Sequence, residues 1–304
     1  MVLLLHRLGL PHKLSSKLDN HHQTPPPESL SASLQAFRSD VSNRLHQLLG
    51  NPAPELEFMS LEWIKKCFAL LPVINRAFAK MVVDIDYPMS IWEVGAAEEY
   101  LCYSLNLLEL LNSVTSSISH LDQARLSISH ALSLIETTPS LMTKRATKIR
   151  SANSSKDFKV VGKVGVNEER LWSGKEYVIH EALLLIKSTG FWVFGIVLSG
   201  LSADVRPYMD MRKFIDFTST ALEASLFIEM RNKGCVIKEV REIDDAVASI
   251  ADGRGGDAAT KELKSRLAVL DQVLQAVGEE ADDLFSKILA GRNELLDSLR
   301  RKRQ

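Results

Sequence analysis

The chain of 304 residues is 45% hydrophobic and 25% charged, which is the composition of a globular protein rather than of a disordered one. Its 37 basic residues nearly balance its 38 acidic residues, so the net charge gives no basic footprint for nucleic acid. The three cysteines lie far apart without a CxxC pair, which disfavours a disulfide scaffold and favours buried thiols in a reducing compartment.

Residues 1–28 are predicted to form a disordered tail, because the histidine pair at 21–22 and the prolines at 25–27 give no helical or strand period. The apolar run at the start is broken at residues 6–7 by histidine and arginine, which makes a poor secretory signal. No acidic residue precedes Asp19, so a transit peptide stays open as an alternative. The histidine pair has no third ligand nearby and is not predicted to bind a metal.

An N-terminal helical layer is predicted over residues 29–138, since apolar residues recur there at steps of three and four. The first helix carries them at Leu30, Leu34, Phe37, Val41, Leu45 and Leu48. The second helix is predicted to begin at Ser60 and carries them at Leu61, Ile64, Phe68, Leu71, Ile74, Phe78 and Met81. Pro72 lies inside this second pattern and is expected to kink or split the helix, because proline removes a backbone hydrogen bond.

A third helix is predicted to begin at a capping box formed by Ser90 and Glu93, with Met89 and Val94 as its hydrophobic staple. The helix either continues or breaks near Leu121. Its apolar stripe is assigned to Leu101, Leu105, Leu108, Asn112, Thr115 and Ile118, and then to Leu126, Ile128, Leu132 and Ile135. The aromatic residues of this layer are expected in the core rather than stacked on a ligand: Trp63, Trp92 and Tyr100.

Residues 139–170 are predicted to be a basic flexible linker. Between residues 139 and 165, seven lysines and arginines stand against Asp157 alone, which gives a net charge of +6 by subtraction. The alternative interpretation is a basic strip that contacts anionic lipid or an acidic partner.

A C-terminal helical layer is predicted over residues 171–304, packed on the first and built around the helix Tyr177–Ala203. This helix is expected to begin at a capping box of Ser173 and Glu176. Residues 188–203 carry no charge, and a helix that is apolar on every side is buried either among other helices or in lipid. Sixteen residues fall short of the roughly 20 that span a bilayer, so burial in protein is favoured.

The rest of this layer is predicted to hold a turn at 204–207, a helix that ends at Gly234, a shorter helix over 236–250, and a loop at 252–257. The last helix has the most regular seam, in alternating steps of four and three. The seam consists of Leu263, Leu267, Leu270, Leu274, Val277, Ala281, Leu284, Ile288, Gly291, Leu295 and Ser298. Such a heptad pattern packs against a partner helix, and an internal antiparallel partner is favoured over another subunit.

No catalytic constellation is found. His180 and Glu181 begin like the zinc motif HExxH, but Leu184 stands where the second histidine must be. The loop at 252–257 lacks the ligand alternation of a calcium loop, and no serine lies in a GxSxG turn. We therefore predict no catalytic, cofactor-binding or metal-binding residues, and no enzyme.

Four segments resemble the plant BYPASS family: Phe58–Trp63 (FMSLEW), Asp86–Trp92 (DYPMSIW), Glu99–Asn112 (EYLCYSLNLLELLN) and Leu284–Asp297 (LFSKILAGRNELLD). The resemblance implies a plant protein that acts in development, in a family whose prototype restrains a root-derived mobile signal that arrests shoot growth. It also implies a protein partner, either an exocyst subunit or a signalling protein. The matching motifs consist of core residues, so no functional residue is transferred.

The expected fold is an all-α helical bundle with long antiparallel helices and a heptad-patterned C-terminal helix. The expected function is that of a non-catalytic developmental regulator that binds proteins, with an anionic membrane surface as a further contact. The alternative is a single-pass membrane protein, anchored by residues 188–203, with a role in membrane traffic. The expected location is the cytoplasm or a membrane surface, with the chloroplast as the alternative. Neither a nucleic acid nor a cofactor is expected.

Overall fold

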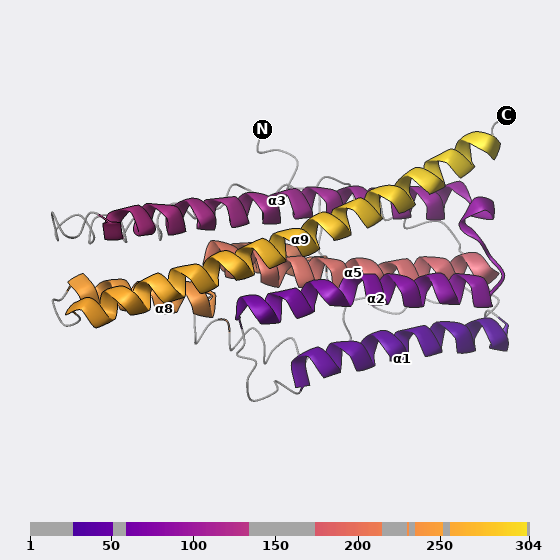
Figure 1. Cartoon of the computed structure of the whole chain (residues 1–304). Coiled ribbons are helices and arrows are strands. Elements are labelled where there is room, and N and C mark those ends of the chain that lie inside the picture. The colour runs from indigo at the N-terminus through magenta and orange to yellow at the C-terminus, as the bar shows by residue number, and fades with distance from the viewer. Residues whose placement is uncertain are drawn as a thin grey trace, which may run out of the picture.

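The structure is a computed structural model that describes residues 27–50, 59–133, 174–214, 230, 235–251 and 256–302. Regular structure in these ranges is helical, which confirms the predicted all-α helical bundle (Figure 1). The elements are α1 (Glu28–Gly50), α2 (Leu61–Asp84), the 3₁₀ turn η2 (Met89–Ile91), α3 (Val94–Ser133), α5 (Gly174–Ser202), α6 (Arg206–Arg212), α8 (Lys238–Ala251) and α9 (Gly256–Lys302). The predicted basic linker lies outside the described residues, as do nearly all of the predicted tail and most of the loop at 252–257.

Helices α2, α3, α5 and α9 form the body of the bundle, and α1 lies along the outside of α2 and α5 (Figure 1). Helix α9 runs antiparallel to α3. At one end of this pair, Arg125 of α3 forms an ion pair of 2.9 Å with Asp271 of α9. Toward the other end, Arg292 of α9 donates to the Ser104 hydroxyl at 3.0 Å. The internal antiparallel partner expected for the last helix is therefore α3.

Helix α2 follows its sequence pattern closely. Ser60 caps its first turn, since the Ser60 hydroxyl accepts a hydrogen bond of 3.1 Å from the Trp63 backbone amide. All seven predicted apolar positions are buried. Pro72 lies within this helix, which continues to Asp84, so the predicted splitting is wrong. The continuous apolar face packs on α1 and α5 and holds the helix together past the proline.

Helix α3 begins later than predicted and is rotated relative to the predicted stripe. Ser90 lies in η2 rather than at the helix start, and Val94 is 62% exposed, so the capping box and staple are wrong. Leu105, Asn112 and Thr115 are exposed. Leu108, Ile128 and Leu132 are buried as predicted, and the buried face also includes Tyr103, Ser104, Leu107, Leu111, Val114 and Leu121. Because α3 packs against both α5 and α9, its buried surface is wider than one stripe. The helix continues through Leu121 without a break.

The aromatic residues of the first layer pack in the core, as predicted. Trp63 and Trp92 are buried, and the Trp92 indole donates to the Tyr87 carbonyl at 2.9 Å. The Trp92 ring contacts the ring of Tyr100 edge to face at 6.1 Å.

Helix α5 occupies the centre of the bundle, where α1, α2, α3 and α6 surround it (Figure 1). Every residue from Ser188 to Leu201 is buried. In the part of the chain that the structure describes, α5 is the one helix long and apolar enough to cross a membrane, and 83% of its most apolar window is covered by protein. The structure thus buries this helix in protein, as the length of its charge-free window predicts. Its predicted capping residue, Ser173, lies outside the described residues.

The close packing around α5 depends on a glycine. A Cβ placed on Gly195 would lie 3.1 Å from the Met211 Cβ and 3.2 Å from the Tyr208 Cα of α6. Helix α6 can therefore lie directly against the α5 backbone, and Tyr208 donates its backbone amide to the Ser199 hydroxyl at 3.0 Å.

Most of the predicted seam of α9 is buried, and Gly291 is partly buried. Leu263, Leu267, Leu270, Leu274, Val277, Ala281, Leu284, Ile288 and Leu295 are all buried. They pack on α2, α3 and α8, while the opposite side of α9 faces solvent with charged residues.

Candidate functional site

Three charged or titratable side chains meet between α3 and α5. One carboxylate oxygen of Glu99 on α3 accepts a hydrogen bond of 2.8 Å from the Lys187 ammonium. The other oxygen forms a hydrogen bond of 2.8 Å with Nδ1 of His180. All three side chains are largely buried. Lys187 lies at the boundary of the charge-free part of α5, and Glu99 provides the countercharge that lets it remain inside the bundle.

The electrostatics of this cluster keep Glu99 ionised. Burial alone would raise the pKa of the Glu99 carboxyl, but the hydrogen bond from His180, together with the charge and hydrogen bond of Lys187, outweighs burial and lowers it. A carboxylate with a lowered pKa is a poor proton carrier at neutral pH, because general acid–base catalysis favours a pKa near the operating pH. The cluster therefore acts chemically as a buried ion pair that fixes α5 against α3.

His180 and Glu181 turn toward different neighbours. While His180 contacts Glu99 of α3, Glu181 forms an ion pair with Arg38 of α1. The two residues that begin like a zinc motif thus help to hold α5 between α3 and α1. Among the described residues, no group of three or more His, Cys, Asp and Glu side chains is placed to hold a metal ion.

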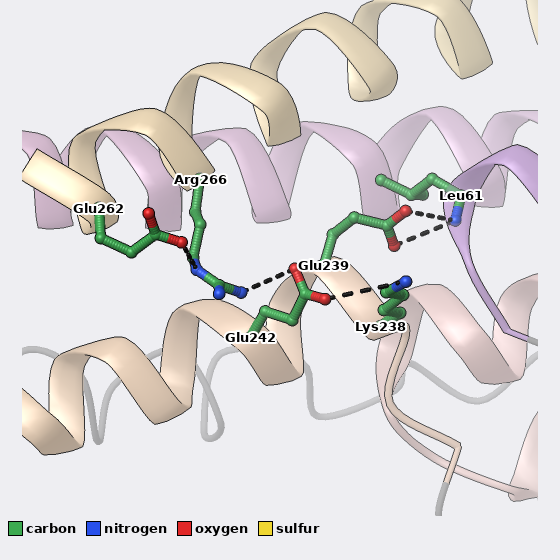
Figure 2. A network of polar contacts seen from close by, with 6 residues as sticks. All are labelled: Leu61, Lys238, Glu239, Glu242, Glu262 and Arg266. Atoms are coloured by element: carbon green, nitrogen blue, oxygen red, sulfur yellow. Dashed lines mark hydrogen bonds and ion pairs between the residues drawn. The ribbon is translucent and has the colours of Figure 1, made fainter. Parts of the chain in front are cut away.

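A second polar network joins the two halves of the chain where α8 meets α2 (Figure 2). The Glu239 carboxylate of α8 accepts from the Leu61 backbone amide at 3.0 and 3.1 Å, which satisfies a donor in the first turn of α2. Burial raises the pKa of Glu239, with a smaller contribution from the charge of Glu242. The backbone amide of Lys238 also donates to the Met59 carbonyl at 2.9 Å. This contact fixes α8 at the start of α2.

The same network continues to α9 through Arg266 (Figure 2). The Arg266 guanidinium pairs with Glu242 of α8 and with Glu262 of its own helix, each at 2.8 Å. Lys238 approaches Glu242 at 3.9 Å. These side chains are partly exposed, so they orient the α8–α9 hairpin more than they stabilise it.

A third feature is the surface around the turn between α2 and α3, which we call the α2–α3 turn surface. Val83 and Val94 are 75% and 62% exposed, the two highest values among the large hydrophobic residues that the structure describes, and Ile91 between them is 51% exposed. Nearby carboxylates are also exposed: Asp84, Asp86 and Glu98. Three large apolar side chains exposed close together in the chain, among exposed carboxylates, favour an interaction site here.

Sequence reasoning found some of these residues and missed others. It singled out His180 and Glu181, but for a metal motif that fails, and it defined a charge-free segment that begins directly after Lys187. It missed Glu99 and Glu239. For Glu99 there is one signal in the sequence: the residue lies four positions before the buried Tyr103, on the side of α3 that faces α5.

Comparison with known proteins finds sequence similarity to plant proteins. The chain is 22% identical over 293 residues to "Protein BPS1, chloroplastic" of Arabidopsis thaliana, an alignment that covers 88% of this chain and 83% of that protein. It is 24% identical over 204 residues to "UPF0496 protein 4" of Oryza sativa subsp. japonica, covering 60% of this chain and 44% of that protein. The chain therefore spans less than half the length of the rice relative.

Two other comparisons gave no match: neither a protein-family model nor a solved structure matches the chain. The match to BPS1 runs over most of both proteins. The resemblance is thereby confirmed: the chain is similar to the BYPASS-like plant protein BPS1 and to a UPF0496 protein of rice, and its described residues form an all-α fold.

Proposed function

We propose that this protein is a non-catalytic regulator of plant development that acts by binding other proteins, as its resemblance to the BYPASS family implies. The observation that carries the proposal is the α2–α3 turn surface. There, Val83, Ile91 and Val94 are exposed, whereas most of the other large apolar residues in the described ranges are buried. Burial of such side chains against a partner is favourable by roughly 25 cal/mol per Å² of apolar surface.

The use of the buried charges supports a non-catalytic role. Glu99 pairs with His180 and Lys187, and Glu239 caps α2, so these groups hold helices together. Their positions are explained by packing without any need for a substrate.

The test is a binding measurement with purified plant exocyst subunits, the partner class that the resemblance implies. Wild-type protein is compared with Val94→Asp, and with Val269→Asp on α9 as a matched control, because Val269 is also exposed but lies far along the chain. The proposal predicts that Val94→Asp weakens binding about tenfold or more and that Val269→Asp does not. Absence of binding by the wild-type protein to every subunit would contradict the exocyst as partner, and equal effects of the two substitutions would contradict this surface.

A second candidate function rests on α5. Because this helix is long and apolar enough to cross a membrane, a single-pass membrane protein anchored by residues 188–203, with a role in membrane traffic, is the alternative. It requires α1, α2, α3 and α6 to leave α5, which would expose the buried Glu99–Lys187 pair. Extraction of plant membranes with alkaline carbonate separates the two proposals: a bundle is released, whereas a spanning protein stays in the pellet.

The relative and the expected partner point to different compartments for this protein. The name of the Arabidopsis relative gives that protein a chloroplast address, and the early residues of this chain have the composition of a transit peptide. Binding to an exocyst subunit, in contrast, would require that this protein be in the cytoplasm. A fluorescent protein fused to the C-terminus, observed in leaf cells, decides between chloroplast and cytoplasm.

A further inference from the structure

Helix α1 is held in the bundle by one narrow apolar stripe. Its buried side chains are Leu34, Phe37, Val41 and Leu45, and its other described side chains are half-buried or exposed. Steps of three and four residues place these four side chains on one face of the helix. That face packs on α2 and α5, while the opposite face lies at the outside of the bundle (Figure 1).

We call the surface of α2 and α5 that α1 covers the α1 seat. Phe78 of α2 and Glu181 of α5 belong to it, because each contacts a side chain of α1. The rings of Phe37 and Phe78 lie 6.2 Å apart, and the Phe78 ring also lies 6.1 Å from the ring of the buried Trp92. Phe78 therefore keeps a packing partner in the body of the bundle when α1 is absent. Phe37 has the character of an anchor, since a few large, well-packed side chains supply most of the binding energy of an interface.

Recognition in the α1 seat also involves one charge. Arg38, directly after Phe37, forms an ion pair with Glu181, whose side chain is 23% exposed. The neighbouring α1 charges Arg44 and Asp40 pair with each other. An occupant without a cation at the position of Arg38 would leave a largely buried carboxylate without its partner.

The cations of α2 and α5 have other positions. Lys65 of α2 pairs with a glutamate of its own helix. On α5, Lys175 donates to the Asp86 carbonyl and Lys187 pairs with Glu99. The remaining cations of α2 are exposed: Lys66, Arg76 and Lys80. Glu181 thus takes its countercharge from the helix in the seat.

Few contacts hold α1 in its place. It packs mainly on α2 and α5, whereas α5 is surrounded by α1, α2, α3 and α6. The side chains of the Arg38–Glu181 pair are 44% and 23% exposed, and a pair this accessible adds little stability. Elements with few buried apolar contacts open at a lower free energy than the core. Helix α1 is therefore suited to leave the bundle while the body stays folded.

We infer that the α1 seat is a binding site for a helix of another protein, and that α1 occupies the seat until such a helix takes its place. The seated α1 shows the chemistry of that partner: apolar residues at positions i, i+3, i+7 and i+11, the second of them aromatic and followed by arginine or lysine. Amphipathic helices are recognised through apolar anchors at such a spacing. The inference goes beyond the α2–α3 turn surface and does not depend on that surface as a binding site.

The probe is a fluorescent peptide of residues 27–50, whose binding to the full-length protein is followed by anisotropy. In the wild-type chain, α1 competes from within the same molecule at an effective concentration on the order of millimolar, so the peptide binds weakly. Phe37→Asp in the full chain removes the anchor of its own α1 and opens the seat. We expect the peptide to bind this variant at least about tenfold more tightly than wild type. Ser39→Asp, on the exposed face of α1, is the matched control and should bind the peptide as wild type does.

A charge exchange tests whether the peptide binds in the seat. In the Phe37→Asp chain, the added substitution Glu181→Arg should weaken binding of the peptide about threefold or more, because like charges then face each other. A peptide with Arg38→Glu should regain the lost affinity on this chain. A peptide bound elsewhere, or a chain merely loosened by its substitutions, would not show this exchange.

Hydrogen exchange of the wild-type chain tests the opening of α1 without any substitution. We expect the amides of α1 to be at least about tenfold less protected than those of Ser188–Leu201 in α5, because α1 opens locally and the core opens only with the whole protein. Circular dichroism verifies that the Phe37→Asp chain keeps the helical content of the body.

Three outcomes would overturn the inference. Equal protection of α1 and α5 would mean that α1 leaves only when the protein unfolds. Equal peptide affinity of the folded Phe37→Asp and Ser39→Asp chains, or no effect of the charge exchange, would mean that the peptide does not bind in the seat. A concentration-dependent dimer of wild type that Phe37→Asp abolishes would assign the seat to α1 of a second copy. No exocyst subunit is used, so this result stands apart from the test of the proposed function.

Discussion

Helices α5 and α9 both run along most of the bundle, yet they bury different parts of their surfaces. From Ser188 to Leu201 every residue of α5 is buried, because α1, α2, α3 and α6 cover all of its sides. Helix α9 buries one seam and leaves charged residues such as Glu279 and Asp283 exposed on its outer side. A helix at the centre must therefore be apolar all round, and a helix at the edge needs apolar residues on one stripe.

The comparison shows why α5 resembles a membrane span in sequence. Lipid and a protein core both require an apolar side chain at every position, so composition alone does not separate them. The polar residues of α5 do separate them here, because Glu181, His180 and Lys187 each have a partner on another helix. In lipid those partners would be lost.

The largest expected loss of stability comes from an aspartate placed in the buried part of α5, compared with an aspartate on the outer side of α9. Val197 of α5 is fully buried, whereas Val269 of α9 is 49% exposed. Val197→Asp buries a carboxylate without a partner and should cost more than about 4 kcal/mol of unfolding free energy. Val269→Asp should stay within about 0.5 kcal/mol of wild type. Urea unfolding followed by circular dichroism measures both, and equal losses would contradict the difference in burial.

The next largest loss of stability is expected in the seam of α9, where a buried leucine can be compared with an exposed leucine of the same helix. Leu274 is buried in the seam of α9. Leu289, which follows the seam residue Ile288, is 39% exposed. Leu274→Ala leaves a cavity and should cost about 2–5 kcal/mol, and Leu274→Asp should cost more. Leu289→Ala should cost less than about 1 kcal/mol. Thermal melting at two protein concentrations also checks that α3 is the partner, since a dependence on concentration would instead indicate a second chain.

A smaller effect distinguishes two glycines. Gly195 of α5 lies against the backbone of Tyr208, whereas a Cβ on Gly278 of α9 would meet nothing within 4 Å. Gly195→Ala should force α6 outward and cost about 1–3 kcal/mol. Gly278→Ala should stabilise the protein by up to about 1 kcal/mol, because alanine favours helix more than glycine does. Stabilisation by both substitutions would show that α6 does not pack closely on α5.

The same contrast explains which parts of the fold could be predicted from the sequence. Helices α2 and α9 each present one apolar face, so their boundaries and buried residues follow from periodicity. Helix α3 buries a surface wider than one stripe, and the predicted stripe failed in the first part of the helix, at Leu105, Asn112 and Thr115, while Leu108, Ile128 and Leu132 are buried as predicted. Leu105 was chosen because it is apolar, yet it faces solvent, while Ser104 is buried because Arg292 donates to its hydroxyl.

The polar contacts between helices could not be predicted for a related reason. Glu99 meets Lys187 only because of the rotation of α3 relative to α5, and Glu239 reaches Leu61 only because α8 begins beside α2. A local sequence pattern does not identify either pair of partners, although the spacing of Glu99 from Tyr103 indicates the side of α3 on which Glu99 lies. The exposed residues Val83 and Val94 were likewise missed, because one was not part of any predicted stripe and the other was assigned to a staple.

The smallest effect compares a buried ion pair with an exposed one and should depend on pH. Glu99→Gln leaves Lys187 without a countercharge and should cost about 1.5 kcal/mol at pH 7. The control is Asp283→Asn on α9, which removes an exposed pair with Lys287 and should cost less than about 1 kcal/mol.

The pH dependence follows from the lowered pKa of Glu99. Because the pKa of this carboxyl in the folded protein lies below its ordinary value of 4.5, the folded state holds the proton less tightly than the unfolded state. The stabilisation is therefore complete above pH 4.5 and is lost as the pH falls through the lowered pKa. Urea unfolding of wild type and Glu99→Gln between pH 7 and pH 3 should show a difference that shrinks only below pH 4.5. A difference that stays constant down to pH 3 would show that the Glu99 carboxylate is not held by His180 and Lys187, and that the polar half of α5 packs in another way.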